Sequence, residues 1–237
     1  YKYIFENPIP ILNAYKVTII ISVAGTLLYL VIASMCAYAI SRPGFKYRRA
    51  ITFYLFFTML FKGGLVPTYI LMTQFLKLKD TYTALILPLM VNVWLLFIMR
   101  TFFSQLPVEI FESATVDGAG EVRIFLQIVL PLSKPVFATV GLMMLLNLWN
   151  AWYEAMLYSN AATMYPLQYM LQVMLRNIQE ILKDMTMNVP GGGAMFDIPT
   201  ENTRMAMCIL AAGPMLVVFP FFQKYFTRGL TVGAIKG

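Results

Sequence analysis

The chain has 237 residues, of which 59% are hydrophobic and 12% are charged, and its mean hydropathy is +0.70. These values exclude an ordinary soluble domain and predict a membrane protein, in which the net charge of +7 is first of all a guide to topology. The complete absence of histidine excludes histidine-based metal sites and the catalytic triads that depend on a histidine.

The first apolar segment, residues 17–40, has the length of about 20 residues that a helix needs to cross a bilayer. Ala33, Ala37 and Ser41 recur at every fourth position, which predicts close packing against another helix. The loop that follows, SRPGFKYRR, carries four basic residues. The positive-inside rule places such a loop in the cytoplasm.

The second apolar segment, residues 51–72, is interrupted by the glycines at 63–64 and by Pro67, which predicts a broken helix that lines a cavity. Lys62 stands just before the break, about 18 Å from the cytoplasmic start of the segment at ~1.5 Å per residue. An ionisable side chain at that depth is a candidate for the transport path. The alternatives are that it reaches toward the outer interface or that it pairs with Glu154.

The fourth apolar segment, residues 136–158, contains the motif NLWNAWYEA. A helical projection at ~100° per residue places its asparagines and glutamate on one face and its large aromatic residues on the other. We expect the polar face to line the path and to offer hydrogen bonds to sugar hydroxyls. The alternative is that the asparagines join helices to one another and that the glutamate lies at the outer surface. With one polar residue of the third segment, 83–103, the path candidates are Lys62, Asn92, Asn147, Asn150 and Glu154.

Residues 159–202 form a long loop that the alternation of segments places outside the cell. Apolar residues recur at a helical period from Leu167 to Met185, which predicts an amphipathic helix too polar to cross the membrane. The glycines at 191–193 are not a phosphate-binding loop, because the pattern G-x-x-x-x-G-K-[ST] is absent. A fifth apolar segment, 203–222, completes five predicted spans with an external N-terminus and a cytoplasmic C-terminus.

A polar hairpin, residues 104–134, separates the third and fourth segments. Pro107 favours a helix start, and Gly118 and Gly120 favour a sharp turn between two short helices. The hairpin contains four acidic and two basic side chains, which argues against binding to nucleic acid.

This hairpin resembles the EAA loop of permease subunits in bacterial ATP-driven importers of the ABC type. In that family the short helix of the loop fits a cleft of the ATPase and transmits nucleotide-driven motion to the membrane helices. The resemblance implies that Glu112 meets a basic group on the ATPase, whereas the alternative is a hairpin that only connects two spans. Ser113 departs from the family's triplet by a small-for-small exchange. The coupling positions implied by the resemblance are Glu112, Ser113, Ala114, Asp117, Gly118 and Ala119.

Further stretches, among them AYAISRPGFKYRR, GGLVPTY, PLQYML, PFFQKYF and GAIKG, resemble the carbohydrate-importing, maltose-type branch of the family. The resemblance implies an all-α, polytopic transmembrane domain of a type I importer over residues 1–237, from which the first of six family helices is missing. It implies an ABC ATPase dimer, a second homologous permease subunit and an extracellular sugar-binding protein as partners. ATP and Mg²⁺ would be bound by the ATPase, so this chain would need no cofactor and no metal and would not be an enzyme.

The expected function is therefore that of a multi-pass subunit of the bacterial cell membrane that moves an oligosaccharide into the cytoplasm by alternating access. A uronate-containing oligosaccharide would suit Lys62, because an ammonium near the path complements a carboxylate. The alternatives are a permease for another solute class and an ion-driven secondary transporter. Uptake that depends on ATP rather than on an ion gradient would separate the importer from the secondary transporter.

Overall fold

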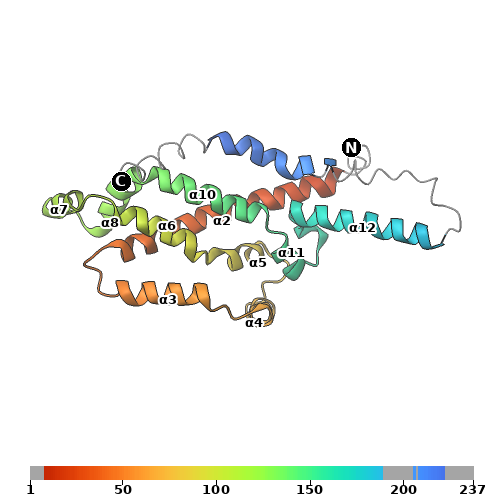
Figure 1. Cartoon of the computed structure of the whole chain (residues 1–237), viewed down its shortest axis with the longest axis horizontal. Coiled ribbons are helices and arrows are strands. Elements are labelled where there is room, and N and C mark those ends of the chain that lie inside the picture. The colour runs from red at the N-terminus through yellow and green to blue at the C-terminus, as the bar shows by residue number, and fades with distance from the viewer. Residues whose placement is uncertain (1–7, 189–204, 207, 222–237) are drawn as a thin grey trace, which may run out of the picture.

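The computed structural model describes residues 8–188, 205–206 and 208–221. The regular elements in these ranges are helices and none is a strand, which confirms the predicted all-α class. Figure 1 shows an elongated molecule with α7 (Val108–Val116) and α8 (Glu121–Ile124) at one end. At the other end α12 (Leu167–Asn188) extends away from the helices that form the body.

The body is built around α2 (Pro8–Ser41), a continuous helix of 34 residues. It packs mainly against α6 (Val93–Ser104) and α10 (Lys134–Trp149). Buried apolar side chains of these three helices form the main core, and the same core continues into α7 and α8. The end of the molecule that carries the hairpin is therefore packed as one unit with the helices of the body.

Small side chains let α2 approach its neighbours closely. Ala33, Ala37 and Ser41 are 2%, 0% and 7% exposed, so the predicted stripe is a packing surface. Gly25 faces α10, where a Cβ atom at this position would stand 2.6 Å from Leu148 Cδ1. A larger residue at position 25 would therefore require the Leu148 side chain to move.

Of the described residues, one helix, Ile9–Ser41, is long and apolar enough to cross a membrane without a break. Three further segments are pairs of helices joined at a bend, and the total is four spans if each pair crosses once. The described part of the fifth predicted span, Cys208–Phe221, is a shorter apolar helix. The bent pairs are Arg48–Leu60 with Leu65–Phe75 at 109°, Tyr82–Met90 with Val93–Ser104 at 54°, and Glu121–Leu132 with Lys134–Trp149 at 80°.

Several of the bent segments are built from short elements, including single turns of π-helix that locally widen the helix. In the first pair these are α3 (Arg48–Leu60), α4 (Leu65–Ile70) and the π-helical η1 (Leu71–Phe75). In the second pair α5 (Tyr82–Ile86) and η2 (Leu87–Met90) precede α6. In the third pair η3 (Phe125–Val129), also π-helical, and α9 (Leu130–Leu132) join α8 to α10.

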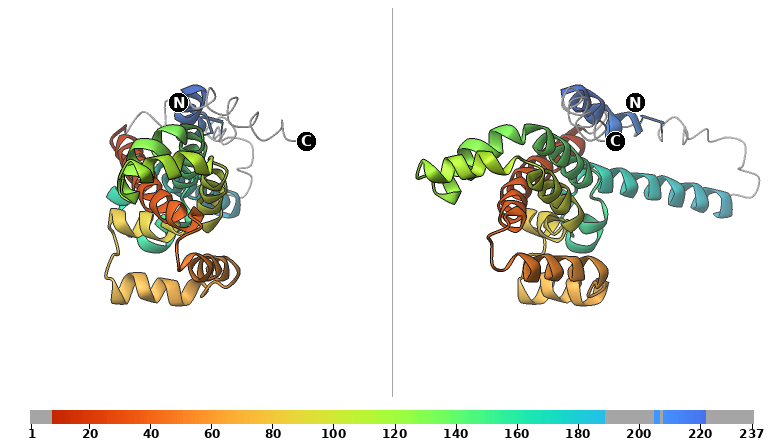
Figure 2. Two further views of the ribbon diagram at one scale, coloured as in Figure 1. Left: turned by 90° about the vertical axis from the view of Figure 1, so that its left-hand side faces the viewer. Right: turned by 60° about the vertical axis from the view of Figure 1, so that its left-hand side comes forward.

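The second predicted span is broken where the sequence predicts a break, and the change of direction is sharp. Gly64 has a φ of +90°, a left-handed conformation that glycine adopts without strain, and it precedes α4 directly. The two helices of the pair lie at one edge of the molecule and meet at 109° (Figures 1 and 2). No residue of α3 or of α4 is buried, so this pair is only loosely covered by the rest of the body.

The prediction of a continuous helix over residues 136–158 is wrong. The chain leaves the helical path after Trp149 and resumes it in α11 (Tyr153–Tyr158). At this point the Leu146 carbonyl accepts both the backbone N–H of Asn150, over 3.1 Å, and its side-chain amide, over 2.8 Å, while the N–H of Ala151 bonds to Leu148 three residues back. A helical projection that treats the asparagines and the following glutamate as one face therefore fails beyond this point.

The amphipathic helix predicted in the long loop is present as α12. Its apolar residues Leu167, Leu171 and Ile178 are at most 8% exposed and pack with apolar residues of α2 and of segment 205–221. The backbone N–H of Leu167 donates to Thr18 Oγ1 over 2.7 Å and fixes the start of the helix on α2. The glycines at 191–193 and residues 222–237 lie outside the part of the chain that the structure describes.

Asp80 holds the turn between η1 and α5. Its carboxylate accepts hydrogen bonds from the backbone N–H groups of Asn160 and Ala161, at 2.6 Å and 3.0 Å. Its own N–H donates to the Tyr158 carbonyl over 3.0 Å. The N–H groups of Ala161 and Asn160 lower the pKa of the Asp80 carboxyl because they favour its charged form. This turn is therefore tied to the loop that follows α11.

Candidate functional site

The predicted polar hairpin consists of α7, a tight turn and α8. Gly118 ends α7 with a φ of +76°, a conformation that disfavours residues with a Cβ atom. The N–H groups of Gly118 and Ala119 donate to the carbonyls of Thr115 and Ala114, at 3.0 Å and 2.9 Å. These two bonds form a Schellman motif, in which glycine is the usual residue at the left-handed position. The local sequence is therefore sufficient to explain the turn.

The two faces of α7 have different surroundings. Phe111 and Ala114 are 6% and 7% exposed and belong to the main core, and Ala119 is partly buried against it. The opposite face points away from the body and is exposed in the part of the chain that the structure describes. The predicted coupling residues that are exposed are Glu112, Ser113, Asp117 and Gly118. The structure thus divides the six predicted positions into an inner pair that anchors the hairpin and an outer set available to a partner.

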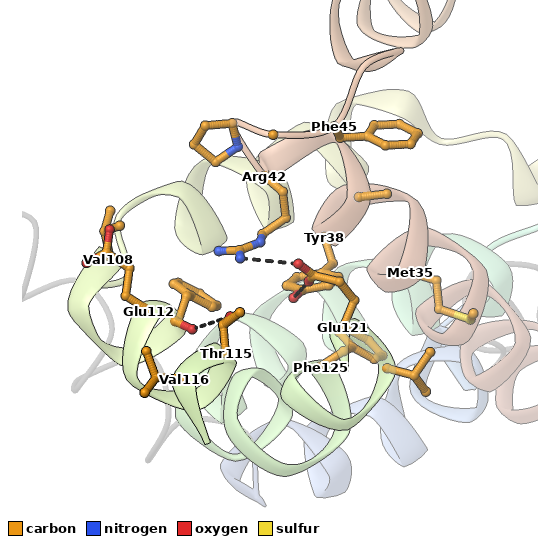
Figure 3. Close-up of a pocket in the computed structure, with 15 residues that line it drawn as sticks. Met35, Tyr38, Arg42, Phe45, Val108, Glu112, Thr115, Val116, Glu121 and Phe125 are labelled. Atoms are coloured by element: carbon orange, nitrogen blue, oxygen red, sulfur yellow. Dashed lines mark hydrogen bonds and ion pairs between the residues drawn. The ribbon is translucent and has the colours of Figure 1, made fainter. Parts of the chain in front are cut away.

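A polar contact that the sequence did not suggest holds the hairpin to the end of α2. Glu121, the first residue of α8, accepts a hydrogen bond from the Tyr38 hydroxyl and forms an ion pair of 3.3 Å with Arg42. The Arg42 guanidinium also lies 4.3 Å from the centre of the Phe111 ring on α7. Figure 3 shows Arg42 directed toward Glu121. We call Tyr38, Arg42 and Glu121 the clamp.

Sequence reasoning used Arg42 only as a topology marker and Glu121 only as part of a charge balance. The two residues are separated by 79 positions, so no local pattern reports their contact. A largely apolar cavity of about 810 Å³ lies beside the clamp, with Val108, Glu112 and Val116 of α7 on one wall. The exposed side of the coupling helix therefore borders a hollow (Figure 3) rather than a flat surface.

Three of the predicted path residues meet in one groove of about 340 Å³ between α6 and α10, which we call the asparagine groove. Asn92, Asn147 and Asn150 line it, together with Trp94 and apolar residues of both helices. Asn92 precedes α6, and its Oδ1 accepts from the Leu95 N–H over 3.2 Å. Asn147 is exposed in the groove. The groove therefore combines amide groups with an aromatic ring, a combination suited to the polar and apolar faces of a sugar.

The other two predicted path residues do not line this groove. Lys62 is exposed in the break between α3 and α4, and Glu154 lies in the first turn of α11. No ion pair joins Lys62 to Glu154, both of which the structure describes, so that alternative is not formed. Within the same ranges, no three acidic or cysteine side chains gather in a way that could hold a metal ion.

Comparison with known proteins gives consistent results along nearly the whole chain. The sequence profile of the family described as "binding-protein-dependent transport system inner membrane component" matches residues 29–232. Protein LplC of Bacillus subtilis (strain 168) is 40% identical over 239 residues, which cover all of this chain and 78% of LplC. The polygalacturonan/rhamnogalacturonan transport system permease protein YtcP of the same organism is 38% identical over 237 residues, all of this chain and 81% of YtcP.

A solved structure has the same fold. It belongs to a bacterial ABC transporter involved in the import of the acidic polysaccharide alginate, and the match has a TM-score of 0.78 and 28% sequence identity. The match covers 92% of this chain and 75% of the other. The family profile spans the clamp, the hairpin and the asparagine groove alike.

Proposed function

The chain belongs to the family of inner-membrane components of binding-protein-dependent transport systems, and we propose that it conducts an oligosaccharide through an ATP-driven importer by alternating access. It is a transport component. In this proposal ATP and Mg²⁺ are bound by partner ATPase subunits, and this chain itself catalyses no reaction. Uptake is then driven by motion that the ATPase delivers to the membrane helices.

The observation that carries the proposal is the hairpin at one end of the molecule. Its outer face presents Glu112 to a partner, while Phe111 and Ala114 on its inner face share one core with α2, α6 and α10. Because protein cores are close-packed, a displacement of α7 moves the helices on which it packs. The arrangement suits an element that is displaced by a partner beyond the membrane surface and transmits this displacement to the membrane-spanning helices.

The proposed partners follow from placing the hairpin on the cytoplasmic side of the membrane. We propose that an ATPase dimer meets the hairpin in the cytoplasm, that a second homologous permease lies beside this chain, and that an extracellular sugar-binding protein docks at the opposite end. The basic loop after α2 supports this orientation, since Arg42 contacts the hairpin and cationic loops remain in the cytoplasm. The N-terminus would then be external and the C-terminus cytoplasmic.

For the substrate we propose an acidic oligosaccharide, such as one that contains uronate. The solved relative imports an acidic polysaccharide, and YtcP is named for polygalacturonan and rhamnogalacturonan. Lys62, exposed in the break of the second span, offers a positive charge for such a substrate. Lys62→Met should therefore reduce uptake of uronate oligomers several-fold and leave uptake of a neutral oligosaccharide unchanged. Undiminished uronate uptake at equal expression would remove Lys62 from the path.

The coupling role is tested by Glu112→Ala in the complete importer, reconstituted in proteoliposomes. We expect ATP hydrolysis to continue while uptake falls at least tenfold, because the exposed carboxylate is lost and the fold of the hairpin is not. Glu180→Ala is the matched control, since Glu180 is equally exposed but lies on α12. Normal uptake by Glu112→Ala, or an equal loss in the control, would contradict the coupling assignment.

A further inference from the structure

A second cavity, of about 990 Å³, lies on the other side of the loop that follows α2. We call it the basic cavity. Its walls come from this loop, from the start of α3 and from α6. Pro43, Gly44 and Phe45 line both this cavity and the one beside the clamp. The other lining residues are Lys46, Arg48, Arg49, Thr52, Phe53, Phe56, Phe97 and Arg100.

The charged residues in the walls of the cavity are all cationic. Lys46, Arg48, Arg49 and Arg100 line it, and no acidic residue does. None of the four has an ion-pair partner among the residues that the structure describes. Four positive charges held around one hollow repel one another, so an anion within it would be stabilised by all of them.

Two polar atoms in the same walls lack hydrogen-bond partners. They are the Nε of Arg100, a donor, and the hydroxyl of Thr52, and both are inaccessible to solvent. Unpaired buried polar groups are uncommon in folded proteins because each loses its hydrogen bonds to water. Both atoms belong to residues that line the cavity, but neither is open to it as the side chains stand. The preference for a phosphate or a similar oxyanion therefore comes from the four cationic side chains.

Four phenylalanines also line the cavity. Two of them, Phe53 and Phe56, are 69% and 48% exposed on α3, which has no buried residue. They lie one to two turns beyond Arg48, which begins α3, and Arg100 lies about 6 Å before the end of α6 at ~1.5 Å per residue. The cations therefore cluster at one level, with apolar rings next to them toward the interior of the span.

We propose that the basic cavity binds the anionic phosphate headgroup of a membrane glycerophospholipid, whose acyl chains lie along the exposed side of α3. The inference rests on the orientation proposed above, which puts the cavity at the cytoplasmic leaflet. Basic pockets between membrane helices on that side are a known way of recognising anionic lipid headgroups. A headgroup with two oxygens free can pair with arginine in a bidentate manner.

Other occupants fit less well. The chain's own residues 222–237 contain Lys224, Arg228 and Lys236 and no aspartate or glutamate, so their side chains do not complement the cavity. The transported sugar is expected elsewhere, because the asparagine groove shares no lining residue with the basic cavity. A free phosphate would satisfy the cations but would leave the exposed rings of α3 uncovered.

The test is native mass spectrometry of the importer purified in mild detergent, with dioleoyl phosphatidylglycerol and dioleoyl phosphatidylcholine added at equal concentrations. We expect phosphatidylglycerol to be retained on this subunit in preference to phosphatidylcholine. Arg49→Gln should weaken its retention about fivefold, and the double change Arg49→Gln with Arg100→Gln more than tenfold. Arg100→Lys should bind more tightly than Arg100→Gln, because the charge remains, and less tightly than wild type, because lysine cannot pair in a bidentate manner.

Lys134→Gln is the matched control, since Lys134 is exposed and lies outside both cavities. Equal retention of the two lipids, displacement by an excess of inorganic phosphate, or the same loss in Lys134→Gln as in Arg49→Gln would each overturn the proposal. Arg49 is exposed, so its replacement does not threaten folding. The same spectra report whether an ATPase subunit is bound. Its absence from a folded preparation would contradict the proposed function, while selective lipid retention would still stand.

Discussion

At two turns of this molecule a carboxylate holds neighbouring segments together, but the groups that it contacts differ. At the hairpin, Glu121 contacts side chains of α2, the Tyr38 hydroxyl and the Arg42 guanidinium. At the other turn, Asp80 accepts hydrogen bonds from backbone N–H groups of the loop after α11. A contact with backbone groups fixes the course of the chain, whereas long side chains can release a partner and bind it again.

The exposed fractions of the clamp side chains support this distinction between the two turns. The Glu121 side chain is 62% exposed and that of Arg42 is 21% exposed, so water screens their ion pair. Exposed ion pairs contribute about 0–1 kcal/mol, which is small enough for a partner to break the contact. The hairpin therefore combines a firm hydrophobic anchor with a weak polar clamp, as a moving element requires. The Asp80 turn has the opposite character and resists displacement.

The largest effect is expected at the glycine of the hairpin turn. Gly118→Val places a β-branched residue at a φ of +76°, where a side chain costs about 1–2 kcal/mol or more, and so distorts the outer face of α7. We expect uptake to fall at least tenfold while ATP hydrolysis by the assembled importer persists. The measurement is uptake and hydrolysis in the same proteoliposomes.

Gly120→Val is the control for this change. Gly120 has a φ of −70° and a ψ of 160°, an extended conformation that valine favours, and open space surrounds it. Uptake by this variant should stay near normal. If both variants or neither lose uptake, the left-handed turn is not what couples the hairpin to the ATPase.

An intermediate effect is expected at the Asp80 turn. Asp80→Ala removes both hydrogen bonds to the loop after α11 and should lower the free energy of unfolding by about 1–2 kcal/mol, seen as a lower thermal midpoint in detergent. Asp80→Asn keeps an acceptor oxygen and should lose less. A midpoint unchanged in Asp80→Ala would show that the loop is held by other contacts.

The charge of Asp80 also predicts a pH dependence. Its pKa is lowered in the folded protein by the N–H groups of Ala161 and Asn160, so the folded state favours the carboxylate. The stabilisation is complete above the ordinary aspartate pKa of about 3.9 and disappears as the pH falls through the lowered value. The midpoint difference between wild type and Asp80→Asn should therefore shrink in that acidic window.

The smallest effect is expected at the clamp. A double-mutant cycle with Arg42→Gln and Glu121→Gln should give a coupling energy below about 1 kcal/mol, because the Glu121 side chain is largely exposed and water screens the pair. Uptake should change only a few-fold, since the inner face of α7 still packs on the core. A coupling energy of several kcal/mol would mean that the clamp is rigid and that the contrast with Asp80 fails.

The sequence by itself determined the features that depend on neighbouring residues. Hydropathy identified the membrane class, the Gly118 turn followed from local chemistry, and the glycines at 63–64 marked a real break. The amphipathic period identified α12 in the same way. Each of these rests on backbone preference or on the period of one helix, which a short stretch of sequence specifies.

Only the tertiary structure decided the contacts between distant segments. The clamp joins positions 79 residues apart, and the asparagine groove brings Asn92 beside Asn147 because α6 and α10 both pack on α2. The helix end at Asn150 also escapes prediction from the sequence. The Asn150 side chain donates to the Leu146 carbonyl of its own helix and accepts from Gln168 Nε2 on α12 over 3.2 Å, and the second contact depends on packing that is not encoded in the adjacent residues.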